Sequence, residues 1–249
     1  VSGAWSAPTV VNNVETLCCV KHIIDRGPEW FKGIGRNERN TGPKLYCVSG
    51  HVEKPGVYEA PMGIVFRDLL EMCGGMKGGR KLKAVIPGGS SAPVLTGEEI
   101  IDVPMDFDGV AAAGSMLGSA AVIVMDETTD MPKALTNIAK FYAHESCGQC
   151  TPCREGTPWL HKMLERIVAG QGKRTDIELI LQVAGQMGNG MTICVFADAA
   201  IAPILSAIPK FREELEAYVE RSASPGFEQP APAGITPKLA ERMAEGMHS

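Results

Sequence analysis

Apolar residues follow two different periods along the chain, and the change divides it into segments. Between positions 44 and 126 the apolar runs are short and are punctuated by Pro and Gly: KLYCVSG, VYEAP, LKAVIPGG and SAAVIVMD. Such runs are typical of strands, and the turn at 53–56 predicts that the first two form a hairpin. A helix is predicted at Ile64–Met72, ended by Gly74 and Gly75. Two strands, one helix and two more strands predict a small α+β domain, with a β-grasp as the leading topology.

Beyond Thr128 the apolar residues recur at helical spacing. The first helix, within MPKALTNIAKFYAHE, has a stripe of Leu135, Ile138, Phe141 and Tyr142. Thr157 and Pro158 have the pattern of an N-cap followed by a first-turn proline, so the second helix is expected to begin there and to bury Trp159, Met163, Leu164, Ile167 and Val168. Further helices are predicted at Asp176–Met187, after Cys194, and at Lys210–Arg221. These elements predict a small helical bundle.

The two ends of the chain differ from both of these parts. A helix is predicted at Val14–Asp25, closed by Gly27 and Pro28, and residues 1–40 are interpreted as the C-terminal remnant of an upstream domain. Residues 222–249 hold four prolines among small and charged residues, which predicts a flexible tail. The expected organisation is therefore multidomain α+β: remnant 1–40, β-grasp domain 41–127, helical domain 128–221 and tail 222–249.

Charge and hydropathy exclude two classes of partner. The chain has a net charge of -5, and no run of Lys and Arg is longer than two residues, so the basic surface of a nucleic-acid-binding protein is missing. The apolar runs are shorter than the roughly 18 residues of a membrane span. Association with a membrane is expected only through partners. Eight cysteines without a secretory signal indicate a reducing compartment, the cytoplasm or an organelle matrix.

Four of the cysteines form the strongest chemical signal. Cys147, Cys150 and Cys153 have C-x2-C-x2-C spacing, and Cys194 follows after forty intervening residues. A 4Fe-4S cluster needs one thiolate for each iron, and this arrangement supplies three from one loop and a fourth from a distance. Structural zinc usually takes two separated pairs, so a zinc site is the weaker alternative, and core thiols are a third. Because four thiolates saturate four irons, the pattern predicts electron transfer instead of substrate binding.

The residues around the motif suggest how the loop is shaped. Gly148 is expected to allow a close approach of the backbone, and Arg154 is expected either to contribute positive charge or simply to be solvated. Unlike the motif cysteines, the other four lie among apolar residues and are predicted to be core residues: Cys18, Cys19, Cys47 and Cys73.

At this point several motifs resemble a known family. ESCGQCTPCREG with the distant TIC, IPGGSS with AAVIVMD, SGHVEKPG, and PTVVNNVETL resemble the flavoprotein (F) subunit of respiratory complex I, NADH-quinone oxidoreductase. The resemblance covers about residues 8–221. The flavin subunits of NAD-reducing hydrogenases and NAD-dependent formate dehydrogenases share these motifs, so they remain alternatives.

The resemblance implies a fold, cofactors and site residues. It implies the tail of a Rossmann-like domain for FMN and NADH, a soluble-ligand-binding β-grasp domain, and a helical domain whose 4Fe-4S cluster is held by Cys147, Cys150, Cys153 and Cys194. Electrons would pass from NADH-reduced FMN through the cluster towards quinone. By the same resemblance Asn12, Asn13 and Thr16 belong to the FMN pocket, although an Asx-capped helix start explains them equally well.

The resemblance also implies partners and a location. The expected partners are the other peripheral-arm subunits of complex I, including a 2Fe-2S subunit. The expected location is cytoplasmic, at the inner face of the plasma membrane, or on the matrix side in mitochondria, through the complex.

Two readings from other classes stay open. In the first, the cysteines bind zinc and stabilise a module for protein interaction. In the second, the β-grasp domain binds a small molecule on its own, with PGGSS cradling a phosphate, although glycine-rich turns are commoner than phosphate sites.

The chain departs from the family pattern in one respect that predicts its activity. No G-x-G-x-x-G fingerprint occurs in its 249 residues, so we expect a chain truncated at its N-terminus that binds iron and sulfide but does not oxidise NADH. An assay of NADH oxidation with added FMN and an artificial electron acceptor checks this, and measurable turnover would contradict it.

Overall fold

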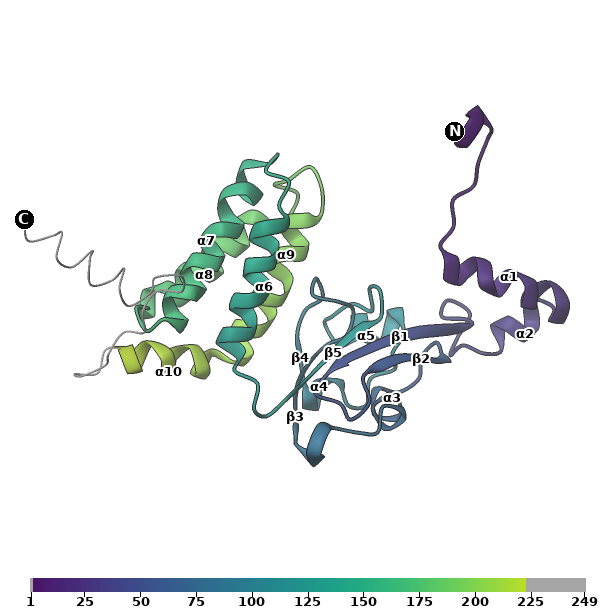
Figure 1. Cartoon of the computed structure of the whole chain (residues 1–249), viewed down its shortest axis with the longest axis horizontal. Helices are drawn as coiled ribbons and strands as arrows, with labels where there is room; N and C mark the ends of the chain where they lie inside the picture. The colour runs from purple at the N-terminus through teal and green to yellow at the C-terminus, as the bar shows by residue number, and fades with distance from the viewer. Residues whose placement is uncertain (1, 223–249) are drawn as a thin grey trace, which may run out of the picture.

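The computed structural model describes residues 2–222, and the predicted tail beyond Ser222 lies outside them. Figure 1 shows a central sheet with a bundle of long helices at one end and a pair of shorter helices at the other. The described part is thus a mixed α/β fold. None of the helices between residues 2 and 222 combines the length and the apolar character that a membrane span requires.

The N-terminal helical pair consists of α1 (Val14–Arg26) and α2 (Pro28–Lys32), after a short 3-10 turn at Ala4–Ser6. The Asn13 side chain caps α1 by accepting the Thr16 amide at 2.8 Å. Glu15 joins α1 to the sheet, since its carboxylate accepts from the Lys44 ammonium at 2.6 Å and from the Leu45 amide at 2.8 Å. The predicted helix at 14–25 is therefore confirmed.

Five strands form one mixed sheet: β1 (Pro43–Gly50), β2 (Gly56–Pro61), β3 (Leu82–Ile86), β4 (Leu95–Thr96) and β5 (Ala121–Asp126). Their order is β2-β1-β5-β3-β4, in which β1 and β5 are parallel and the other pairs antiparallel. The predicted hairpin of the first two strands is confirmed. Short helices cover the sheet: α3 (Phe66–Met72), α4 (Gly97–Ile100), α5 (Phe107–Ala112) and a 3-10 turn at Lys77–Gly79.

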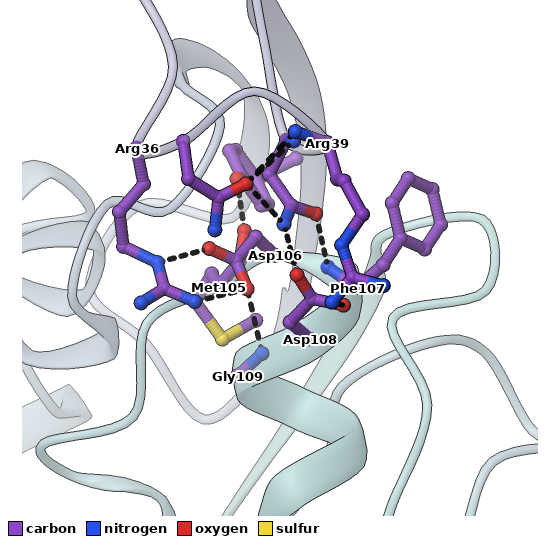
Figure 2. A network of polar contacts seen from close by, with 10 residues as sticks. Arg36, Arg39, Met105, Asp106, Phe107, Asp108 and Gly109 are labelled. Carbon is purple, nitrogen blue, oxygen red and sulfur yellow. Dashed lines mark hydrogen bonds and ion pairs between the residues drawn. The ribbon is translucent and has the colours of Figure 1, made fainter.

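A buried polar network holds residues 36–40 against the start of α5 (Figure 2). The Arg36 guanidinium donates to both carboxylate oxygens of Asp106, which also caps α5 by accepting the Gly109 amide at 2.6 Å. Asn40 accepts the Phe107 amide at 3.1 Å. Burial opposes ionisation of Asp106, but its hydrogen bonds with Arg36 and Gly109 outweigh burial and lower its pKa.

Five helices form the bundle: α6 (Met131–Glu145), α7 (Thr151–Val168), α8 (Arg174–Met187), α9 (Phe196–Lys210) and α10 (Arg212–Ser222). Their core is continuous with residues Ala84, Ile86, Ala92 and Val94 of the sheet region. Polar contacts reinforce this junction. The Val94 amide donates to the Ser206 hydroxyl at 2.8 Å, and the Lys210 ammonium donates to the Val94 carbonyl at 2.9 Å. The sheet and the bundle therefore form one packed unit.

The start of α7 differs from the prediction. The helix begins at Thr151 and Pro152, six residues before the expected Thr157, which is buried and donates its hydroxyl to the Cys153 carbonyl at 2.9 Å. Two Thr-Pro pairs occur in this segment, and the first of them begins the helix. The longer helix turns Trp159 outward, with 53% of its surface exposed.

The prediction that four cysteines are core residues was wrong for most of them. Only Cys73 is buried, whereas Cys18 and Cys47 are exposed and Cys19 is partly exposed. Cys47 lies between buried neighbours on β1 and therefore points to the opposite, open face of the sheet. Nothing in the described part of the chain covers the outer face of α1, which has no buried residue.

Asp126 at the end of β5 is the most strongly perturbed carboxylate of the sheet. Its fully buried side chain accepts from the Thr128 hydroxyl at 2.7 Å, from the Thr128 amide at 3.0 Å and from Arg80 at 3.0 Å. His51 Nδ1 lies 3.0 Å away. These hydrogen bonds, led by that of the Thr128 hydroxyl, lower the pKa of Asp126 to about 2 in spite of burial.

This pKa predicts an acid-dependent contribution to stability. Because the folded-state pKa lies below the unfolded value of 3.8, the ionised carboxylate stabilises the fold above about pH 4, and the contribution is lost as the pH falls through about 2. We expect Asp126→Asn to be less stable than wild type at neutral pH, by a margin that shrinks between pH 4 and pH 2. Urea titrations across this range measure the margin.

The matched control is Asp25→Asn, since Asp25 lies on the exposed surface in an ion pair with Lys21 at 3.0 Å. Exposed pairs contribute little to stability. This variant should follow the wild-type acid profile, and a margin for Asp126→Asn that stays constant with pH would contradict the assignment.

Candidate metal centre

The four motif cysteines line one cavity at the end of the bundle. Its volume is about 180 Å³, and it lies between the loop that joins α6 to α7 and the segment that precedes α9. Cys147, Cys150 and Cys153 come from the loop, and Cys194 comes from the segment. The remaining wall consists of Glu145, Gln149, Thr192, Phe196 and Ala197. The structure thus brings together the residues that the spacing singled out.

The loop is shaped by its backbone. Cys150 occupies the N-cap position of α7, and Cys153 lies in the first turn, buried with 6% exposure. Gly148 has φ of 79°, in the left-handed region that favours glycine. The nearest atom to a Cβ built there is the Arg154 Cδ at 3.8 Å, so backbone conformation and not crowding within the chain explains this glycine.

Arg154 fastens the loop. Its guanidinium donates to the Gly148 carbonyl at 3.1 Å and to the Glu155 carboxylate at 3.0 Å. The contacts therefore show a structural role, with the positive charge shared with Glu155. The side chain of His144, at the end of α6, is exposed and outside the cavity wall.

The segment with Cys194 is turned back towards the loop. Asn189 and Gly190 have φ of 59° and 79°, and the Asn189 amide donates to Asp198 near the start of α9 at 3.0 Å. The Ile193 amide then donates to Cys150 Sγ at 3.3 Å, which links the two parts of the site directly. Sequence spacing gave no signal for this hydrogen bond, because a backbone amide has the same chemistry at every position.

A second donor lies beside a second sulfur. Ser146 Oγ is 3.3 Å from Cys153 Sγ. Thr192, the other hydroxyl in the wall, donates to the Cys194 carbonyl at 2.7 Å and not to a sulfur. Hydrogen bonds to cysteine sulfur are typical of iron–sulfur sites, where they stabilise the negative charge of the thiolates.

The arrangement fits a cluster better than a single ion. Within residues 2–222, no three His, Cys, Asp or Glu side chains lie close enough together to hold one metal ion. The four thiols instead surround a wider space, as a cubane with one thiolate for each iron requires.

An aromatic pair connects the site to the sheet region. Phe196, in the cavity wall, packs edge-on against Tyr142 of α6 with ring centroids 5.5 Å apart. The Tyr142 hydroxyl lies 2.7 Å from Ser91 Oγ and 3.1 Å from Ser90 Oγ. The serines of PGGSS are therefore engaged by the bundle, which weakens the reading of this loop as a phosphate cradle.

The predicted flavin residues lie elsewhere in the molecule. Asn12, Asn13 and Thr16 stand at the start of α1, and Figure 1 places α1 at the opposite end of the sheet from the bundle. The observed contact between Asn13 and the Thr16 amide is the helix cap that sequence chemistry offered as the alternative. A role of these residues in FMN binding stays a prediction.

Two family descriptions match the chain. Residues 133–218 match the NADH-ubiquinone oxidoreductase-F iron-sulfur binding region, which contains all four motif cysteines, and residues 45–95 match the SLBB domain. In the solved structure of an NAD+-reducing [NiFe]-hydrogenase in the H2-reduced state, one chain is similar with a TM-score of 0.78 and 34% identity. That match covers 98% of this chain and 40% of the hydrogenase chain.

Sequence relatives agree with these descriptions. The second F subunit of the NADH-quinone oxidoreductase of Rhizobium meliloti is 53% identical over 227 residues, which are 90% of this chain and 53% of the relative. The corresponding F subunit of Streptomyces coelicolor is 48% identical over 225 residues, 90% of this chain and 49% of the relative. The chain thus spans about half the length of the curated relatives it matches. Over the part that it spans, the chain belongs to the family of NADH-quinone oxidoreductase F subunits.

Proposed function

We propose that this chain transfers electrons from NADH-reduced FMN towards quinone through a 4Fe-4S cluster bound by Cys147, Cys150, Cys153 and Cys194. The observation that carries the proposal is the convergence of these four thiols on one cavity, inside the region that matches the iron–sulfur family. NADH delivers electrons as a hydride pair, and a flavin can release them singly. A cluster, when bound, supplies one-electron transfer.

The residues of the chain would hold and orient the cluster. Four thiolates leave no iron open to a substrate, which suits an electron carrier. Their combined negative charge needs compensation, and the Ile193 amide and the Ser146 hydroxyl lie in position to provide it. Burial of Cys153 keeps water away from one side of the site.

The FMN and NADH steps involve the whole protein and are proposed on family similarity. The relatives are named as components of NADH-quinone oxidoreductase, and Asn12, Asn13 and Thr16 are our candidates for contacts with FMN. All three are exposed at the start of α1 and accessible to a ligand.

The proposed domain organisation follows from the same comparison. A remnant of the FMN domain at 1–40, a β-grasp domain at 41–127 and a cluster domain at 128–221 agree with the two matched regions. The sheet order β2-β1-β5-β3-β4, with a central parallel pair and a leading hairpin, supports a β-grasp. The boundary near residue 128 divides the chain but not the core, because sheet residues pack into the bundle.

Membership of an NAD+-reducing hydrogenase is the second candidate. It is favoured by the structural similarity to that enzyme, with a TM-score of 0.78 at 34% identity. The first candidate is favoured by the higher identity of 53% to a component of a quinone oxidoreductase.

Partners are expected on the exposed apolar surfaces near the site. Met191, Ile193 and Val195 flank Cys194 and are 62%, 86% and 77% exposed. A groove of about 650 Å³ beside them is lined by Trp159, Met187 and other residues of α7 and α8. Large exposed apolar patches mark interaction sites, which suits the other peripheral-arm subunits, including a 2Fe-2S subunit. Through them the chain would lie at the cytoplasmic face of the plasma membrane or at the matrix face in mitochondria.

A ligand replacement tests the proposal. Cys194→Ser should lower the iron and acid-labile sulfide content, or shift the electron paramagnetic resonance signal of the reduced cluster, while helix content stays largely intact. The reason is that one iron loses its thiolate. Metal analysis and spectroscopy of anaerobically purified protein measure the change.

Cys47→Ser is the matched control, because Cys47 is also an exposed thiol but lies on β1, outside the cavity. It should leave iron, sulfide and the signal unchanged. A colourless wild-type protein with one zinc would support the interaction module instead, and an unaltered cluster in Cys194→Ser would exclude Cys194 as a ligand.

A further inference from the structure

Ser146 is fixed beside the least exposed cysteine of the cavity. Its amide donates to the Tyr142 carbonyl at 3.2 Å, which places it immediately after the last turn of α6. Its hydroxyl oxygen lies 3.3 Å from Cys153 Sγ and accepts the Gly148 amide at 3.4 Å. The side chain is therefore held from two sides, and its contact with the sulfur follows from the shape of the loop.

The direction of this hydrogen bond follows from chemistry. A cysteine that binds iron is a thiolate, which can accept but not donate a hydrogen bond. The Ser146 oxygen already accepts from Gly148, so its hydrogen is available for the sulfur. A neutral hydroxyl that donates to an anion makes a charge-assisted hydrogen bond, which is stronger than one between neutral groups.

The surroundings increase the effect of this contact. Cys153 is 6% exposed, so solvent screens the interaction only weakly. Thr192 in the same cavity gives no such contact, since its hydroxyl donates to a carbonyl. The Ile193 amide is the comparable donor, but it belongs to the backbone. Ser146 is thus the side chain through which a substitution can change hydrogen bonding to sulfur here.

We propose that Ser146 is a positioning residue that raises the reduction potential of the cluster by donating a hydrogen bond to Cys153. The inference rests on the proposed function. Reduction adds an electron to an already negative group, and a donor at sulfur stabilises the reduced form more than the oxidised form. Removing the donor therefore favours the oxidised cluster.

The test compares Ser146→Ala with Ser146→Thr in the full chain, purified anaerobically. Redox titration followed by electron paramagnetic resonance should give a lower midpoint potential for Ser146→Ala at wild-type iron and sulfide content. Ser146→Thr keeps the hydroxyl and should return the potential towards the wild-type value. In D2O, pulsed resonance should show a weaker exchangeable deuteron coupling in Ser146→Ala than in wild type.

Thr192→Val is the matched control, because it removes a hydroxyl from the same cavity without removing a donor to sulfur. Its midpoint potential should equal that of wild type. If Ser146→Ala does not bind the cluster, Ser146→Gly makes the same comparison without a methyl group in the loop. An unchanged potential in a loaded donor-free variant overturns the inference and leaves the proposed function standing, whereas wild-type protein without iron and sulfide overturns the proposed function itself.

Discussion

The return of the chain from Cys153 to Cys194 is the constraint on which the site depends. Helices α7 and α8 have 18 and 14 residues, or about 27 Å and 21 Å, so an antiparallel pair brings the chain back to the level at which it started. Their close approach needs Gly156, where a Cβ would lie 2.3 Å from the Met187 Sδ. Gly188 likewise gives room to Ile201 of α9, at 2.7 Å from its Cβ position. Two glycines thus allow a distant cysteine to join a local loop.

The site is also held relative to the sheet. Tyr142 contacts the serines of the PGGSS loop on one side and Phe196 of the cavity wall on the other. At the far end of α9, Lys210 pairs with Glu99 of α4 at 2.6 Å. Burial opposes ionisation of Glu99, but Lys210 and the Thr96 amide outweigh burial and lower its pKa. Because electron transfer depends on fixed distances, this rigid junction suits a carrier that receives electrons from one part of a protein and passes them to another.

The sequence predicted features that have a strong local signal. The cysteine spacing identified the cavity, the Asn13 cap marked the start of α1, and Pro and Gly marked the hairpin. It missed β4, α4 and α5, which have two, four and six residues and are too short to show a period. It misplaced the start of α7, because Thr151-Pro152 and Thr157-Pro158 present the same local pattern, and only packing of Gly156 against α8 requires helix between them. Exposure of Cys18 and Cys47 could not be read from apolar neighbours, since such neighbours do not say which face is covered.

The four sulfurs do not share one environment, and this asymmetry matters for the chemistry. Cys150 and Cys153 are the more buried pair and receive the two hydrogen bonds from the protein, whereas Cys147 and Cys194 are exposed. Water therefore helps to stabilise charge on one side of the site and the protein does so on the other. A partner that covered Ile193 and Val195 would remove this water and lower the local dielectric, which disfavours the more negative reduced state. Assembly and hydrogen bonding thus act on the same equilibrium from opposite sides of the cavity.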